Sequence, residues 1–207
     1  MPPHSPQDES SIRPPHPLAQ RLIERLRERP GSRVLDFCTG SGRNAAALSR
    51  AGHAVAALND DHPAAWPDAP APGRDRFAAV ICTHGLLHGT TETIAGRLSA
   101  LAGLLGADGL FYAVFGSVRD ARFGKGTPID RNTFAPVDGD ERGIAHTYFS
   151  RAPLRALLET DFVIELLEEY DADGVAGSWA HAKQPLLGAV HWFVIAKRRA
   201  PGALRWG

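Results

Sequence analysis

The sequence predicts an α/β protein with a doubly wound, mostly parallel sheet. Three observations lead to this class. Short β-rich runs alternate with helical patterns from residue 33 to about residue 117. A glycine turn joins the first of these strands to the helix after it. The last two strand patterns, at residues 162–170 and 189–198, have no helix between them, so we expect them to pair antiparallel.

The remaining elements follow from their periodicity and from the residues that end them. Residues 17–29 predict the first helix, because apolar side chains recur at helical spacing before Pro30 and Gly31. Further strands are expected at residues 33–37, 53–58, 76–82 and 109–116. Further helices are expected at residues 44–51, 93–105 and 150–159, and a glycine-rich loop from residue 116 to about residue 148.

The composition limits the domain organisation and the partners. The chain has 207 residues, of which 43% are hydrophobic, which fits one domain. We expect that domain at residues 17–200, after a mobile N-terminal arm at 1–16 and before a C-terminal tail at 201–207. Because 23 basic residues balance 23 acidic ones, small-molecule partners are favoured over nucleic acid or membrane. The sequence shows no signal segment, which indicates a cytoplasmic protein with free cysteines.

The turn "DFCTGSGRN" carries the strongest functional signal in the chain. In a doubly wound sheet, ligands bind beyond the carboxyl ends of the strands, where this turn would lie. Gly40 and Gly42 let the backbone approach a ligand, and the next helix directs its free N–H groups toward an anionic or carbonyl group. The pattern also fits a dinucleotide fingerprint with Ala45 in the third glycine position, or a tight turn without a ligand.

Several motifs taken in order resemble one family. "VLDFCTGSGRN", "GHAVAALND", "FAAVICTHGLLHGT", "GLFYAVFGS" and "AVHWFVIAKR" are similar to class I S-adenosylmethionine-dependent methyltransferases across nearly the whole chain beyond the N-terminal arm. The chain is most similar to small-molecule members of the tellurite-resistance type. The resemblance implies a Rossmann-like sheet whose last strand is antiparallel, S-adenosyl-L-methionine as cofactor, and methyl transfer to a small-molecule acceptor.

The resemblance also implies which residues bind the cofactor. Asp36, Gly40 and Gly42 would hold its methionine end, and Thr83 and His84 would flank the sulfonium and the methionine. Asn59 falls where the family usually has the acid that binds the ribose hydroxyls. We prefer the neighbouring Asp60 for this contact, because a carboxylate is a stronger acceptor than an amide.

The chain departs from the family pattern in the turn and at the sheet edge. Cys38 replaces the first glycine of the turn, which must therefore accept a side chain there or adopt a negative φ. Residues 61–76 are too few for a helix and a strand, so the family's third strand, at the sheet edge, is expected to be missing. Trp66, with Asp68 or Asp75, would then cover the adenine, or Trp66 would cap exposed apolar surface in a solvated loop.

Methyl transfer by in-line displacement depends mainly on alignment, so no universal catalytic residue is expected. The catalytic candidates are His84, His88 and Trp179. The two histidines would orient or deprotonate the acceptor, or they are packed or surface residues. Four more side chains are expected at the same edge: Arg119 and Asp120, as an anion-orienting or simply exposed ion pair, and His146 and His181.

The sequence does not spell out a metal site with three or four ligands, and we predict none. Cys38 and Cys82 follow neighbouring strands and could together bind a soft metal or metalloid, although packing of free thiols is the favoured interpretation. The departures from the family pattern also leave open a degenerate cofactor-binding or interaction protein without catalysis. The glycine turn alone leaves open an NAD(P)-dependent oxidoreductase.

Overall fold

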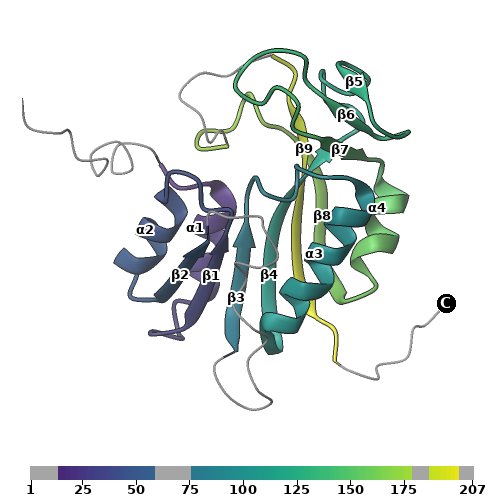
Figure 1. Ribbon diagram of the computed structural model, residues 1–207. Coiled ribbons are helices and arrows are strands. Elements are labelled where there is room, and N and C mark those ends of the chain that lie inside the picture. The colour runs from purple at the N-terminus through teal and green to yellow at the C-terminus, as the bar shows by residue number, and fades with distance from the viewer. Residues whose placement is uncertain (1–13, 59–75, 179–186, 201–207) are drawn as a thin grey trace, which may run out of the picture.

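The computed structural model describes residues 14–58, 76–178 and 187–200, and its centre is a twisted mixed sheet (Figure 1). Hydrogen-bonded pairs place six strands side by side in the order β2-β1-β3-β4-β9-β8. These strands are β1 (Arg33–Phe37), β2 (Ala54–Leu58), β3 (Phe77–Cys82), β4 (Leu105–Ser117), β8 (Phe162–Asp171) and β9 (Val190–Arg198).

The strand directions confirm the predicted doubly wound sheet with an antiparallel last strand. Strands β2, β1, β3 and β4 are mutually parallel where they pair. Strand β9 is inserted antiparallel between β4 and β8. A parallel pairing of β8 and β9 would have required a long crossover, and no helix is described between them.

Helices cover both faces of the sheet, as the alternation of strands and helices predicts. Helices α1 (Pro17–Arg25) and α2 (Arg43–Arg50) share a buried cluster with Val34, Ile81 and Tyr112. Helices α3 (Thr91–Leu104) and α4 (Arg151–Leu158) pack against the other face, with Leu35 and Phe111. None of the described helices is long and apolar enough to span a membrane.

Strand β2 lies at one edge of the sheet. Among the described residues it pairs only with β1, and its side chains are half-buried or exposed. The expected absence of the family's third strand stays a prediction. Residues 61–76, on which that expectation depends, lie almost entirely outside the described part of the chain.

The segment predicted as a glycine-rich loop contains three short strands, β5 (Thr127–Pro128), β6 (Thr133–Ala135) and β7 (His146–Phe149). Strand β7 pairs in parallel with the last two residues of β4, and β6 pairs antiparallel with β5 and β7. The strands are too short for their periodicity to stand out among glycines and polar residues. This pairing fixes residues 127–149 at the carboxyl edge of the main sheet, at the top of Figure 1.

Candidate functional site

The glycine turn lies at the carboxyl end of β1 and opens beside the backbone. Gly40 and Gly42 have φ values of 56° and 75°, the left-handed region that favours glycine. A Cβ added at either position would meet no atom within 4 Å, so the described residues leave space next to the turn. Gly42 is the N-cap of α2, whose first N–H groups lack intrahelical partners. The turn therefore presents backbone donors beside open space.

Asp36, the acid that precedes the turn, is 1% exposed. Its Oδ2 accepts a hydrogen bond from Thr39 Oγ1 at 2.6 Å. Its Oδ1 is buried and accepts no hydrogen bond of ordinary geometry among the described residues. Burial raises the pKa of Asp36 to about 6, although the backbone N–H of Ala45 in α2 lies near the carboxyl and acts to lower this pKa. A buried carboxylate oxygen without a donor is costly, so Asp36 fits a role as acceptor for a ligand's cationic or N–H group.

Cys38 adopts the left-handed conformation with a φ of 55°, so the turn accepts a side chain rather than a negative φ. Its sulfur packs where a Cβ of Gly85 would lie. The thiols of Cys38 and Cys82 interact, and burial, with Cys38 as a further cause, raises the pKa of Cys82 well above its usual value. Both cysteines are free, and no third metal-ligating side chain joins them in the described part of the chain. The two thiols therefore pack against each other as ordinary side chains.

A chain of buried and half-buried hydrogen bonds connects the turn to the end of β3. His16 N donates to Asn44 Oδ1 at 2.8 Å, and Asn44 Nδ2 donates to Thr83 Oγ1 at 3.1 Å. Thr83 Oγ1 in turn lies 3.1 Å from His84 Nδ1. Sequence reasoning missed His16 and Asn44. The available signal was the position of His16 before Pro17, where its Nδ1 caps α1 by accepting from Leu18 N.

His16 also offers a buried donor. Because its Nδ1 accepts a hydrogen bond in the neutral ring, Nε2 carries the proton. His16 Nε2 is buried and has no hydrogen-bond partner among the described residues. Among the described residues, the same edge of the sheet thus holds an acceptor at Asp36 Oδ1 and a donor at His16 Nε2, and neither has a hydrogen-bond partner there.

Three histidines at this edge are neutral near pH 7. Burial, with Arg43 as the next cause, lowers the pKa of His16 to about 3. Burial, with Arg122 as the next cause, lowers the pKa of His191 to about 4. Burial likewise lowers the pKa of His84, which is held well below its usual value. Neutral imidazoles do not repel a cationic ligand, and His84 is a weak base for an acceptor.

The expectation of an exposed ion pair between Arg119 and Asp120 is wrong. Arg119 is exposed and pairs with Glu169 at 3.2 Å. Asp120 is buried and accepts two hydrogen bonds from the Arg122 guanidinium, each at 2.8 Å, and one from Val190 N at 3.0 Å. Burial alone would raise the pKa of Asp120, but the hydrogen bonds and charge of Arg122 hold it below its usual value. This pair fastens the loop after β4 to the start of β9.

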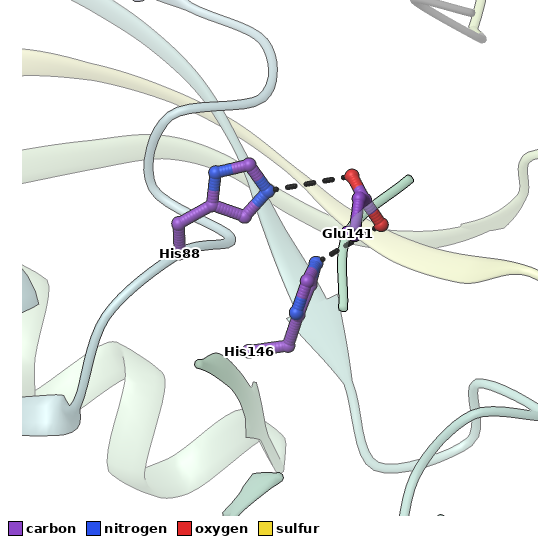
Figure 2. Close-up of side chains that lie close together, drawn as sticks. All are labelled: His88, Glu141 and His146. Carbon is purple, nitrogen blue, oxygen red and sulfur yellow. Dashed lines mark ion pairs between the residues drawn. The ribbon is translucent and has the colours of Figure 1, made fainter. Parts of the chain in front are cut away.

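His88 and His146 lie next to each other, with Glu141 against both (Figure 2). His88 Nε2 lies 3.6 Å from Glu141 Oε1, and His146 Nε2 lies 3.2 Å from Glu141 Oε2. The sequence placed both histidines at this edge but missed Glu141. Glu141 lies in a loop without periodicity, so no local pattern distinguishes it from its acidic neighbours.

The remaining candidates lie outside the described residues. They are Asn59 and Asp60 for the ribose, Trp66, Asp68 and Asp75 for the adenine, and Trp179 and His181 for the acceptor. The contacts predicted for them stay predictions.

This fold, with an antiparallel strand inserted beside β4 and a glycine turn after β1, is that of class I S-adenosylmethionine-dependent methyltransferases. No protein-family model matches the chain, and no curated protein matches it. The chain is similar to solved structures at low sequence identity, and this similarity establishes the fold alone.

One similar structure is the 1,6-didemethyltoxoflavin-N1-methyltransferase of Burkholderia thailandensis, which holds 1,6-didemethyltoxoflavin and S-adenosylhomocysteine. It has a TM-score of 0.60 and 19% identity, over 94% of this chain and 80% of that one. A methyltransferase from Methanosarcina mazei has a TM-score of 0.62 and 15% identity, over 84% of this chain and 96% of that one. A TehB-like methyltransferase from Corynebacterium glutamicum has a TM-score of 0.51 and 15% identity, over 88% of each chain.

Proposed function

We propose that this protein binds S-adenosyl-L-methionine at the glycine turn and transfers its methyl group to a small-molecule acceptor. One observation carries the proposal. Among the described residues, the buried Asp36 Oδ1 accepts no hydrogen bond and the adjacent turn leaves open space, at the carboxyl edge of a methyltransferase-type sheet. Bound S-adenosyl-L-methionine supplies a methyl group activated by a sulfonium.

In this proposal the cofactor's amino-acid end meets complementary groups. Asp36 Oδ1 accepts from the ammonium group, and the His16 Nε2–H donates to the carboxylate. The turn at Gly40 and Gly42 lets the backbone approach the ligand closely. Asp60, or Asn59, contacts the ribose hydroxyls, and Trp66 covers the adenine.

The protein's contribution to the reaction is alignment of the acceptor with the methyl group. Thr83 and His84 lie at the end of β3, where Asn44 holds the Thr83 hydroxyl. Because His84 stays neutral, it orients the acceptor by hydrogen bonding and does not repel the positively charged sulfonium. His88 and Trp179 are the further candidates for acceptor contacts.

Two other functions make different predictions. A degenerate cofactor-binding or interaction protein, suggested by Cys38, Asn59 and the expected loss of the third strand, would transfer no methyl group. An NAD(P)-dependent oxidoreductase would bind NAD(P) at the same turn. Isothermal calorimetry of the purified protein with S-adenosylhomocysteine and with NAD(P) separates the oxidoreductase from the other two. Binding of neither ligand would refute the proposal.

A matched pair of glycine substitutions tests the position of the site. Gly42 and Gly31 have nearly the same φ, 75° and 74°, and an added Cβ meets nothing within 4 Å at either. Gly31 precedes β1, at the opposite edge of the sheet. Gly42→Ala should weaken S-adenosylhomocysteine binding about tenfold or more, equivalent to about 1.4 kcal/mol, because the methyl group enters the ligand's space. Gly31→Ala should leave the affinity unchanged; equal effects of the two substitutions would contradict this placement.

A further inference from the structure

Three side chains from separate parts of the chain converge at the carboxyl edge of the sheet (Figure 2). His88 lies in the loop after β3, His146 is the first residue of β7, and Glu141 lies in the loop before β7. Each offers one ligand atom, and these three atoms lie within 4.8 Å of one another. They form the one such group of metal-ligating side chains among the described residues.

Backbone pairing holds the two histidines beside each other. His88 and His146 form an antiparallel β-bridge. Hydrogen bonds flank this bridge, from Gly89 N to Ala145 O at 2.8 Å and from Thr147 N to Leu87 O at 3.1 Å. The Arg97 guanidinium also donates to the carbonyl oxygen of His88 at 2.6 Å. The imidazoles therefore project from a fixed frame rather than from free loops.

Two of the separations are close to the edges of a small coordination polyhedron. A tetrahedral Zn²⁺ holds nitrogen and oxygen ligands at about 2.0 to 2.2 Å, which places two ligand atoms about 3.4 Å apart. The distances from Glu141 to the two Nε2 atoms are 3.6 Å for His88 and 3.2 Å for His146. These two distances run from different carboxylate oxygens, and the ligand atoms of the three residues lie within 4.8 Å of one another, so the side chains must close around the ion to bind it.

The tautomer of His146 supports the same conclusion. Its Nδ1 lies 2.8 Å from Ile144 O, and a carbonyl oxygen only accepts, so Nδ1 carries a proton. In the neutral ring, Nε2 then directs a lone pair toward the Glu141 carboxylate, which is also an acceptor. Two acceptors at 3.2 Å require a cation or an additional proton between them. An Nδ1–H bond to a backbone carbonyl is also how metal-binding histidines are commonly oriented.

We propose that His88, Glu141 and His146 bind a divalent transition-metal ion of the Zn²⁺ type through both Nε2 atoms and the Glu141 carboxylate. Two imidazoles and one carboxylate are a donor set that suits such ions, and three protein ligands leave a coordination position open. The His146 side chain is 6% exposed, whereas those of His88 and Glu141 are 25% and 26% exposed. The open position therefore faces solvent, where water or a small ligand with an oxygen, nitrogen or sulfur donor can enter.

The site is separate from the proposed cofactor site, since none of its ligands belongs to the glycine turn, although His88 is also a candidate for acceptor contacts. Its place at the same edge of the sheet, with His88 four residues after His84, puts the ion on the side from which an acceptor would approach. Zinc binding and S-adenosylhomocysteine binding can accordingly be measured separately.

Titration of tag-free, metal-stripped protein with Zn²⁺ alone tests the proposal, by calorimetry and by elemental analysis after dialysis. The wild type should bind one Zn²⁺ per chain. Glu141→Gln and His146→Ala should weaken binding by about a hundredfold or more, because loss even of a supporting outer-shell contact costs about 10- to 100-fold. The matched control is Asp140→Asn, an exposed neighbour with the same loss of charge, which should bind Zn²⁺ as the wild type does.

Thermal unfolding provides a second measurement and a check on folding. Excess Zn²⁺ should raise the Tm of the wild type and of Asp140→Asn, but not that of Glu141→Gln, whose side chain keeps the size of the original. If His146→Ala does not fold, Glu141→Gln decides the outcome. The proposal is overturned if the wild type binds no stoichiometric Zn²⁺. That result is expected if the three side chains form only an ion pair with a protonated histidine. It is also overturned if Glu141→Gln binds Zn²⁺ with wild-type affinity.

Discussion

At the residue scale, the replacement of a turn glycine by Cys38 is linked to a glycine elsewhere. A non-glycine residue in the left-handed region costs about 1–2 kcal/mol, yet Cys38 adopts a φ of 55°. Its side chain fills the space in which a Cβ of Gly85 would lie, and that Cβ would also come within 3.2 Å of Cys82 Sγ. Gly85 does not have a left-handed φ. It is therefore needed for space rather than for backbone conformation.

We expect Gly85→Ala to lower the free energy of unfolding by about 1–3 kcal/mol, because it overpacks the Cys38 side chain. In a Cys38→Gly background the same substitution should cost less, with a coupling energy of about 0.5 kcal/mol or more. Urea denaturation of the four proteins of this cycle measures the coupling. Gly96→Ala, inside α3 with open space around the added Cβ, is the control and should stabilise by about 0.5–1 kcal/mol. An unchanged cost of Gly85→Ala in both backgrounds would rule out the link.

At the element scale, the residues before α1 pack onto the N-terminus of α2. Besides the bond from His16 N to Asn44 Oδ1, Arg43 donates to Pro14 O at 3.2 Å. The last residue of the expected mobile arm, His16, is fully buried. One end of α2 thereby organises both the glycine turn and the segment that supplies the His16 donor.

Asn44→Ala should remove the partner of two buried groups, His16 N and Thr83 Oγ1, and lower the free energy of unfolding by about 1–3 kcal/mol. It should also weaken S-adenosylhomocysteine binding, since His16 loses its anchor. Urea denaturation and calorimetry measure the two effects. Ser49→Ala, at an exposed position of the same helix, should change neither. Full affinity in a destabilised Asn44→Ala would show that His16 does not contribute to the cofactor site.

At the scale of the whole molecule, histidines whose pKa is lowered by folding make stability depend on pH. The folded-state pKa values of His16, His84 and His191 lie below the unfolded value of 6.5, so unfolding takes up protons as the pH falls below it. Asp36 opposes this, because its pKa rises from 3.8 to about 6 on folding and unfolding then releases a proton. On unfolding in acid, the three histidines take up three protons and Asp36 releases one. The net uptake of protons favours the unfolded chain.

Stability should therefore be greatest above about pH 6.5 and fall toward about pH 4, by up to about 3 kcal/mol per pH unit for two net protons at 1.36 kcal/mol each. Urea denaturation at a series of pH values measures this slope. His191→Gln removes one of the titrating groups and should flatten the slope by about one proton. Stability that is constant or rises as the pH falls through this window would contradict the prediction.

Sequence reasoning predicted the fold well, because local patterns specify its elements. Hydrophobic periodicity identified the main strands and helices, and the missing helix before β9 indicated its antiparallel direction. The glycine turn was recognisable because only glycine readily adopts the conformations that Gly40 and Gly42 have. For the site, the same reasoning predicted Asp36 and the end of β3, and their roles in cofactor binding stay predictions.

What the sequence by itself determined, then, is the order of the elements, the antiparallel last strand and the glycine turn, since neighbouring residues encode them. The tertiary structure alone decided that Glu141 joins His88 and His146, that Asp120 pairs with Arg122, and that His16 is buried against Asn44. The physical reason is that a polar side chain in a loop has no periodicity. Its partner is set by how strands and loops distant in sequence come together, and only the folded chain brings them within hydrogen-bonding distance.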